Sequence, residues 1–319
     1  MTGQAKSERA PLFDTDLLDM RRTRAMELGF EGRGDFLHRE VAGLLAERLA
    51  EVMRRFDDAL IIGSGGGVYR RALSGTVGTL TELETCAARA VTAGCKAIPS
   101  LDPLPLQPGS LDLVISALEL HWANDPVGQL IQMRRALQPD GLMLTALFGG
   151  QTLHELRTAL AEAEIETTGG LSPRVAPMGE VRDLGGLLQR AGYAMPVADV
   201  ERLTVTYASI VDLMRDLRMM GETNVQIARR HVPMLRDTLR RAGEIYAATF
   251  PAPDGRITAT FEIVMLTGWA PAESQPKPLR PGSAKVRLAD ALGAAEQSAG
   301  ETANPGAASP QKNRNNDPG

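Results

Sequence analysis

A strand that runs directly into a cluster of glycines is the feature that most constrains what this chain can fold into. Residues 59–67 read ALIIGSGGG, with four glycines among the last five. Without Cβ atoms, backbone N–H groups can approach a bound nucleotide closely, and the helix N-terminus that follows favours anionic groups. The loop therefore predicts a cofactor cradle at Gly63, Ser64, Gly65 and Gly67. A plain tight turn remains the alternative for a glycine cluster taken alone.

An acidic residue downstream supports the cradle. Glu82 ends a second strand-like run, residues 78–82. In dinucleotide-type folds an acidic side chain about 20 residues after the glycine loop meets the ribose hydroxyls. We therefore predict that Glu82 binds a ribose.

Composition narrows the class of protein. The chain has 319 residues, of which 43% are hydrophobic and 23% charged, so it can bury a full core. Its net charge of -4 and the scatter of its arginines among acidic residues argue against a nucleic-acid partner. The spacing of the two cysteines, Cys86 and Cys95, matches no metal-ligand set, so we expect no metal and a reduced, cytoplasmic environment. No apolar run reaches about 18 residues, so we expect no direct membrane insertion.

Short apolar runs alternate with amphipathic segments, which predicts an α/β fold with a parallel sheet. The expected strands are 59–63, 78–82, 96–99, 111–117 and 141–148, then 197–207 and 257–269. The expected helices are 35–55, 125–137, 151–164, 180–191, 209–218 and 232–248. We divide the chain into an N-terminal extension (1–34), one domain (35–284) with a helical insertion at about 209–248, and a mostly disordered tail (285–319) whose composition cannot bury a core.

Several motifs together resemble those of the class I S-adenosylmethionine (SAM) methyltransferases. Besides the glycine loop and Glu82, they are LPL (104–106), LDLVISALELHW (111–122) and LQPDGLMLTALFGG (137–150). The resemblance implies a Rossmann-like, mostly parallel seven-stranded sheet with helices on both faces and a helical insertion before the last strand. It also implies SAM as the cofactor, with its adenine near Asp102 and Leu104.

Longer motifs resemble one branch of that superfamily, the complex I assembly factors. These motifs are FGGQTLHELR (148–157), GGLSPRVAP (169–177), DLGGLLQRAGY (183–193), DLRMMGETN (216–224) and LTGWAPAESQPKPLRPGSA (266–284). The branch is an arginine hydroxylase acting on a subunit of the respiratory NADH dehydrogenase, and is related to the malonyl-carrier-protein methyltransferases of biotin synthesis. The resemblance implies an enzyme that methylates or hydroxylates a protein, cytoplasmic or held at the inner membrane by its partner. A non-catalytic assembly chaperone and a malonyl-carrier-protein methyltransferase remain alternatives.

Two positions depart from the superfamily pattern. Ile61 replaces the acidic residue two positions before the first glycine, and Ser100 replaces the acidic residue that usually meets the adenine, although Asp102 lies close by. A lost hydrogen bond to a ligand costs about 1 kcal/mol, or roughly tenfold in affinity. These departures favour the chaperone, whereas the intact glycine loop favours an enzyme.

Candidate catalytic residues follow the strand at 111–117. His121 and Trp122 come just after its carboxyl end, where open α/β sheets bind ligands. His121 can serve as a general base or as a structural histidine, and Trp122 as a pocket wall or a core aromatic. Methyl transfer depends chiefly on alignment, so no nucleophile or metal of the protein's own is needed. Arg157 and Arg174 are candidates for binding a carboxylate of a substrate or partner.

Overall fold

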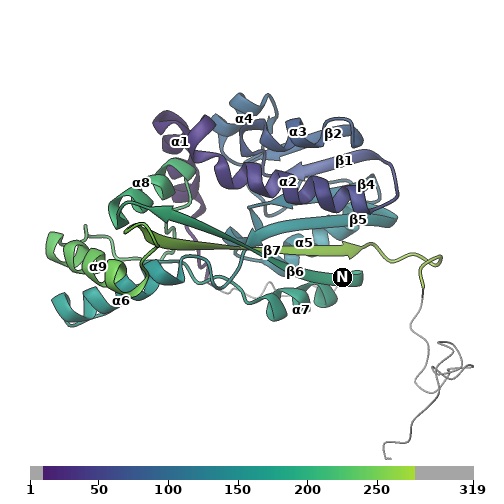
Figure 1. Cartoon of the computed structure of the whole chain (residues 1–319). Helices are drawn as coiled ribbons and strands as arrows, with labels where there is room; N and C mark the ends of the chain where they lie inside the picture. The colour runs from purple at the N-terminus through teal and green to yellow at the C-terminus, as the bar shows by residue number, and fades with distance from the viewer. Residues whose placement is uncertain (1–9, 277–319) are drawn as a thin grey trace, which may run out of the picture. The chain divides into compact units, whose positions relative to one another are not determined.

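A seven-stranded sheet forms the centre of the computed structural model, which describes residues 10–276 (Figure 1). The strand order is β3-β2-β1-β4-β5-β7-β6, and β7 runs antiparallel to both of its neighbours while the other pairs are parallel. This confirms the predicted mostly parallel Rossmann-like sheet. The strands are β1 (Phe56–Ile62), β2 (Val77–Glu84), β3 (Lys96–Ala97), β4 (Leu111–Ala117), β5 (Leu137–Phe148), β6 (Ala194–Tyr207) and β7 (Ile257–Trp269).

Helices fill most of the connections between the strands. The longer ones are α1 (Thr15–Leu28), α2 (Phe36–Glu51), α5 (Pro126–Ala136), α6 (His154–Thr168), α7 (Val181–Ala191), α8 (Ile210–Met220) and α9 (Arg236–Thr249). The shorter ones are α3 (Val68–Leu73) and α4 (Ala87–Ala93), with single turns η1 (Phe30–Gly34), η2 (Gly65–Gly67) and η3 (Leu120–Trp122). All six expected helices are present, with ends shifted by a few residues. The sequence analysis missed α1, α3 and α4, because α3 and α4 are too short to show a helical period and α1 buries a charged residue.

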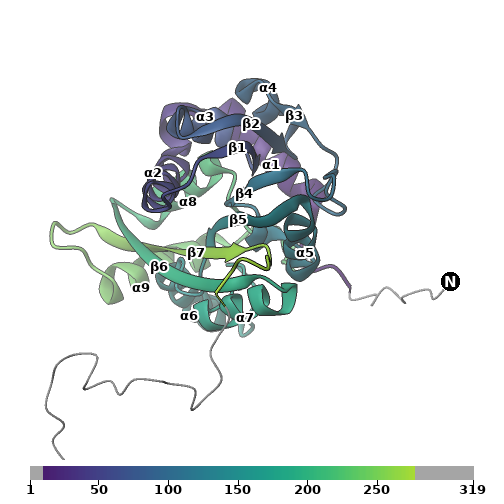
Figure 2. The ribbon, with the colours of Figure 1, turned by 90° about the vertical axis from the view of Figure 1, so that its right-hand side faces the viewer.

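The central strands are buried on both faces, and alternate residues divide between two cores. Ile61 and Ile115 face α2, α6, α8 and α9, whereas Leu60 and Val114 face α5 and α7. Figure 2 shows α2 and α5 on opposite sides of the sheet. Coverage of both faces explains why these strands read as continuous apolar runs.

The predicted helical insertion is present as α8 and α9, which lie between β6 and β7 in the chain. Helix α1 falls in the stretch predicted as an extension, but it packs against α4 and α8 and belongs to the same compact unit as the sheet. The stretch 285–319, predicted to be disordered, lies outside the described residues. The domain boundaries therefore stay predictions.

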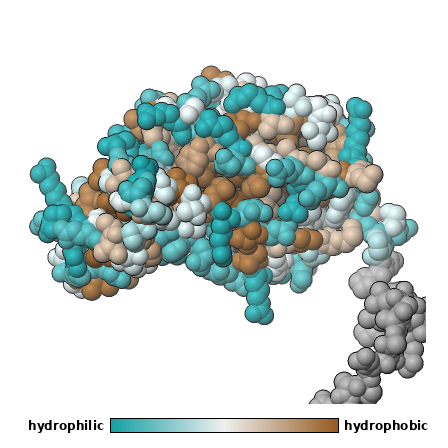
Figure 3. Space-filling view, viewed as in Figure 1, coloured by the Kyte–Doolittle hydropathy of each residue, from teal (hydrophilic) through white to brown (hydrophobic). Residues whose placement is uncertain are grey.

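Two features concern contact with a membrane: where apolar side chains reach the surface, and whether any helix could cross a bilayer. On the face seen in Figure 1, apolar side chains reach the surface mainly in the middle and hydrophilic side chains surround them (Figure 3). Within residues 10–276, no helix combines the length and the hydropathy needed to cross a bilayer.

Candidate active site

The glycine loop lies at the carboxyl edge of the sheet. Because β1, β2 and β4 are parallel neighbours, the residues that follow them meet there. A Cβ on Gly63 would come within 2.6 Å of the carbonyl oxygen of Ala117, at the end of β4, and Gly63 has a φ of 88°. Only glycine allows this left-handed backbone and this close approach of the loop to the strand end.

Glu84, rather than Glu82, is the acidic residue at the glycine loop. Its carboxylate accepts hydrogen bonds from the backbone N–H of Ser64 (3.0 Å), from the Ser64 hydroxyl (2.7 Å) and from the N–H of Cys86 (3.1 Å). Glu82 lies two residues earlier in β2, where its carboxylate pairs with Arg70 at 2.6 Å. The sequence reasoning chose the right strand but placed the end of that strand two residues too early.

Side chains from the N-terminal part of the chain cover the loop. A Cβ on Gly66 would lie 3.2 Å from the ring of Phe30, and one on Gly65 would lie 2.9 Å from Nδ1 of His38. His38 is itself held by a 2.8 Å hydrogen bond between Nδ1 and the hydroxyl of Tyr69. The loop is therefore packed against η1 and α2 in this conformation.

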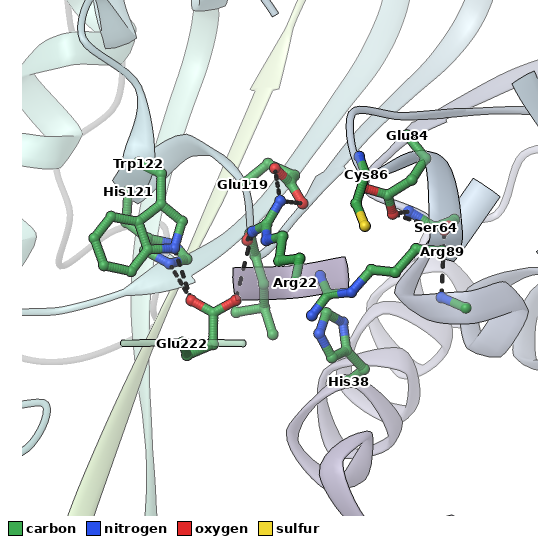
Figure 4. A network of polar contacts seen from close by, with 12 residues as sticks. Arg22, His38, Ser64, Glu84, Cys86, Arg89, Glu119, His121, Trp122 and Glu222 are labelled. Carbon is green, nitrogen blue, oxygen red and sulfur yellow. Dashed lines mark hydrogen bonds and ion pairs between the residues drawn. The ribbon is translucent and has the colours of Figure 1, made fainter. Parts of the chain in front are cut away.

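A buried ion triad links α1 to the site (Figure 4). Arg22 of α1 donates to both carboxylate oxygens of Glu119 at 2.8 Å, and its second terminal nitrogen lies 3.4 Å from Oε1 of Glu222. All three side chains are almost fully buried. Burial lowers the pKa of Arg22, but the two carboxylates outweigh burial and hold that pKa above its ordinary value. The guanidinium is therefore a permanent cation between two acids.

Both predicted catalytic residues converge on Glu222. Its Oε2 accepts a hydrogen bond of 2.7 Å from Nε1 of Trp122 and lies 3.3 Å from Nε2 of His121. Burial disfavours the charge of Glu222, yet the contact with His121 and the charge of Arg22 keep its pKa well below the ordinary range. Burial also lowers the pKa of His121, despite the opposing carboxylate, so this imidazole is neutral at pH 7. Glu222 was not predicted, although it lies in the quoted motif 216–224.

Several buried side-chain nitrogens beside the loop have no hydrogen-bond partner within residues 10–276. They are Nε of Arg22, Nε and Nη1 of Arg89, and Nε2 of His38. The remaining terminal nitrogen of Arg89 donates to the carbonyl of Met220 at 2.6 Å, and its guanidinium lies 4.5 Å from the centre of the Phe30 ring. Buried unpaired guanidinium donors are costly, so the site is suited to an anionic group.

The predicted adenine region follows β3. Leu104 is buried in the core shared with α5, and its N–H donates to the Gln132 side chain at 2.7 Å. Asp102 is exposed, and its N–H donates to the Ser100 hydroxyl at 2.9 Å. Ile61 is fully buried in the apolar core, where a carboxylate would lack a partner. Among the residues described, no cluster of His, Cys, Asp or Glu side chains could hold a metal.

A cavity of about 470 Å³ adjoins the buried network. It lies between α1, α6 and α8, and Trp122, Phe148 and Glu222 are among its walls. Of the two arginines proposed for carboxylate binding, Arg174 lines this cavity and pairs with Glu164 at 2.6 Å. Arg157 instead donates to the backbone carbonyls of Gly150 and Thr152, which precede α6.

The Trp122→Phe substitution tests the convergence on Glu222. It keeps a ring to pack edge-on against Phe13, 5.2 Å away between centroids, but removes the indole N–H that Glu222 accepts. We expect the free energy of unfolding to fall by about 1.5–3 kcal/mol, the range for hydrogen bonds to charged groups, in urea denaturation. The half-buried Trp269 makes no side-chain hydrogen bond within the described part of the chain, so Trp269→Phe is the matched control with a smaller loss. Equal losses in the two variants would contradict the assignment.

Comparisons with known proteins place the chain in a family. Residues 60–145 match the model of the methyltransferase domain. The chain is 37% identical to the mitochondrial arginine-hydroxylase NDUFAF5 of Danio rerio over 88% of its own length and 89% of that protein. The chain belongs to the NDUFAF5 arginine-hydroxylase family. The human member is 35% identical over 88% of this chain and 83% of its own length.

Another relative is a methyltransferase, and a solved structure has a similar fold. The malonyl-[acyl-carrier protein] O-methyltransferase of Laribacter hongkongensis is 34% identical over 75% of this chain and 84% of its own length. Among solved structures, the YcgJ protein of Bacillus subtilis superposes with a TM-score of 0.51 at 14% identity, over 72% of this chain and 98% of that one. The NDUFAF5 family is thus a branch of the class I SAM-dependent methyltransferase superfamily, whose cofactor is SAM.

Proposed function

We propose that this protein is a SAM-binding enzyme that modifies an arginine side chain of a subunit of the respiratory NADH dehydrogenase. The observation that carries the proposal is similarity to arginine hydroxylases over 88% of the chain, far beyond the generic domain at 60–145. The partner follows from the likeness of motifs such as 216–224 to the complex I assembly branch. The protein would act in the cytoplasm, held at the inner membrane by this partner.

The residues at the sheet edge fit SAM. The loop from Gly63 to Gly67 would cradle it, and the carboxylate of Glu84 is the acceptor for its ribose hydroxyls in place of Glu82. The unpaired donors of Arg22 and Arg89 suit the carboxylate of its amino-acid moiety. Asp102 and Leu104 remain the proposed adenine contacts. Bound there, SAM would supply an electrophilic methyl group.

The cavity beyond Arg22 would receive the substrate arginine. Glu222 is the carboxylate that lines it, and the low pKa of Glu222 keeps an anion available to orient a guanidinium. Neutral His121 would donate from Nε2 to Glu222, which leaves the lone pair on Nδ1 as the basic atom. In this role His121 and Trp122 position Glu222.

Mass spectrometry tests the proposal. Subunits of the NADH dehydrogenase from a strain lacking this gene would be incubated with the purified protein and SAM, with dioxygen and a two-electron reductant present in a second reaction. Hydroxylation replaces a C–H bond by C–OH with one oxygen atom of dioxygen, while the other oxygen atom takes up the two electrons and two protons and leaves as water. We expect one arginine to gain the mass of one oxygen atom in the second reaction only. A gain of one methylene group in both reactions would identify a methyltransferase instead.

A non-catalytic assembly chaperone is the second candidate. It is favoured by the packing of Phe30 and His38 over the glycine loop, and by Ile61 and Ser100 in place of the expected acidic residues. The gene would be returned to the strain that lacks it. If assembly of the NADH dehydrogenase were restored while the mass of every subunit stayed unchanged, the result would support the chaperone and exclude the enzyme. With the parent protein as reference, Glu222→Gln separates the two: it should abolish modification, whereas a pure chaperone should tolerate it.

A further inference from the structure

The cavity between α1, α6 and α8 has an apolar floor. Its floor residues are Phe148, Leu156, Leu160, Met178, Met214 and Leu217. These side chains come from three separate helices or strands and from the segment 173–178. A concave apolar surface of this size is typical of a site that receives side chains or ligands.

Arginines also line this cavity. Six of them line the cavity: Arg21, Arg24, Arg174, Arg218, Arg229 and Arg230. Arg174 and Arg230 share the carboxylate of Glu164. Arg229 pairs with Asp14 at 3.2 Å. Three of the six arginines therefore form ion pairs, and they do so with two carboxylates.

The other three arginines form what we call the arginine rim: Arg21, Arg24 and Arg218. None of them pairs with a carboxylate within the described residues. Arg21 donates to the hydroxyl of Thr223 at 3.0 Å and to the carbonyl of Asn224, both uncharged acceptors. Arg24 and Arg218 are exposed. In the part of the chain that the structure describes, the rim thus presents guanidinium groups without ion-pair partners.

The pKa of Arg21 reflects the positive charges that lie close to it. Burial, together with the like charges of Arg229 and Arg218, lowers the pKa of Arg21, while Asp14 opposes the shift. Glu222, which also lines the cavity, forms no ion pair with any of the three rim arginines. An incoming anion would relieve this repulsion.

We propose that the arginine rim binds an acidic segment of the protein substrate, whose neighbouring apolar side chains pack on the cavity floor. The inference rests on the proposed function and specifies its substrate: the modified arginine is flanked by acidic and apolar residues. Glu222 would take the guanidinium in the interior while the rim takes carboxylates at the mouth. A basic flanking sequence would be repelled.

Binding of short labelled peptides tests the rim. One peptide alternates Asp and Glu with Leu and Phe and contains no arginine, and a second replaces its acids by Lys. Fluorescence anisotropy is measured with the parent and with Arg24→Gln/Arg218→Gln, whose side chains are exposed and form no ion pair within residues 10–276. We expect the acidic peptide to bind the parent at low salt and to bind the double variant at least about tenfold more weakly. The Lys peptide should not bind measurably.

A matched control keeps the charge change and moves it away from the cavity. Arg135 and Arg190 are exposed on α5 and α7, so Arg135→Gln/Arg190→Gln should bind the acidic peptide like the parent. Equal weakening in both double variants, equal binding of the Lys peptide, or failure of the acidic peptide to bind would overturn the proposal. Because this measurement needs neither SAM nor catalysis, a negative result would leave the proposed modification reaction to its own test.

Discussion

The Arg22→Met substitution is expected to lower the free energy of unfolding by about 3–5 kcal/mol, the cost of removing one partner from a buried ion pair. Without Arg22, the carboxyl group of Glu119 has no ion-pair partner within the described residues. Glu222 loses one of its three partners and keeps the contacts with His121 and Trp122. Methionine fills much of the volume, so the loss reflects charge more than packing. Urea unfolding followed by circular dichroism measures it.

A second substitution separates charge from packing. In Arg22→Met/Glu119→Gln the buried carboxyl group that Arg22 leaves without an ion-pair partner is removed as well, so the double variant should lose less than the sum of the two single losses. Arg215→Met is the exposed counterpart, because the side chains of Arg215 and its ion-pair partner Asp212 are 62% and 39% exposed, so its removal should cost less. A loss below about 1 kcal/mol for Arg22→Met would show that the triad contributes little to stability.

Glu84→Ala should weaken SAM binding by about 100-fold, since two charge-assisted hydrogen bonds to the ribose are together worth about 3 kcal/mol. Part of this loss would come from the loop itself, because Ser64 relies on Glu84 for its backbone N–H and its hydroxyl. Isothermal titration calorimetry with SAM measures the effect. Thermal unfolding of the same samples verifies that the variant is folded.

Glu82→Ala is the matched control for this prediction. Both residues belong to β2 and both carboxylates are buried, but Glu82 pairs with Arg70 rather than with the loop. Its removal should change SAM affinity by only a few-fold. If Glu82→Ala weakened SAM binding as much as Glu84→Ala, the assignment of the ribose to Glu84 would be wrong, and the assignment to Glu82 made from the sequence would stand.

Much of the fold could be predicted because the signals are local. The apolar runs of β1, β4 and β5 are buried on both faces, so periodicity and length were sufficient to find them. The strand ends were not predicted as well: the expected strand 78–82 ends two residues before β2 does, which is why Glu82 rather than Glu84 became the ribose candidate. Helix α1 was not predicted, because its buried side includes Arg22, and arginine is a residue type that sequence patterns assign to the surface.

In the candidate site, too, some features follow from local sequence signals and others only from the tertiary structure. The sequence by itself determined the sheet, the position of the glycine loop at its carboxyl edge, and the neighbourhood of His121 and Trp122, because parallel strands bring their carboxyl ends together whatever lies elsewhere. Only the tertiary structure decided that Arg22, Glu119 and Glu222 form one buried triad, and that one cavity is bordered by three arginines that pair with no carboxylate of residues 10–276. Arg22 and Glu222 are 200 residues apart in the chain. No local pattern encodes such a contact, because it exists only once α1 and the segment after α8 have packed against the sheet edge.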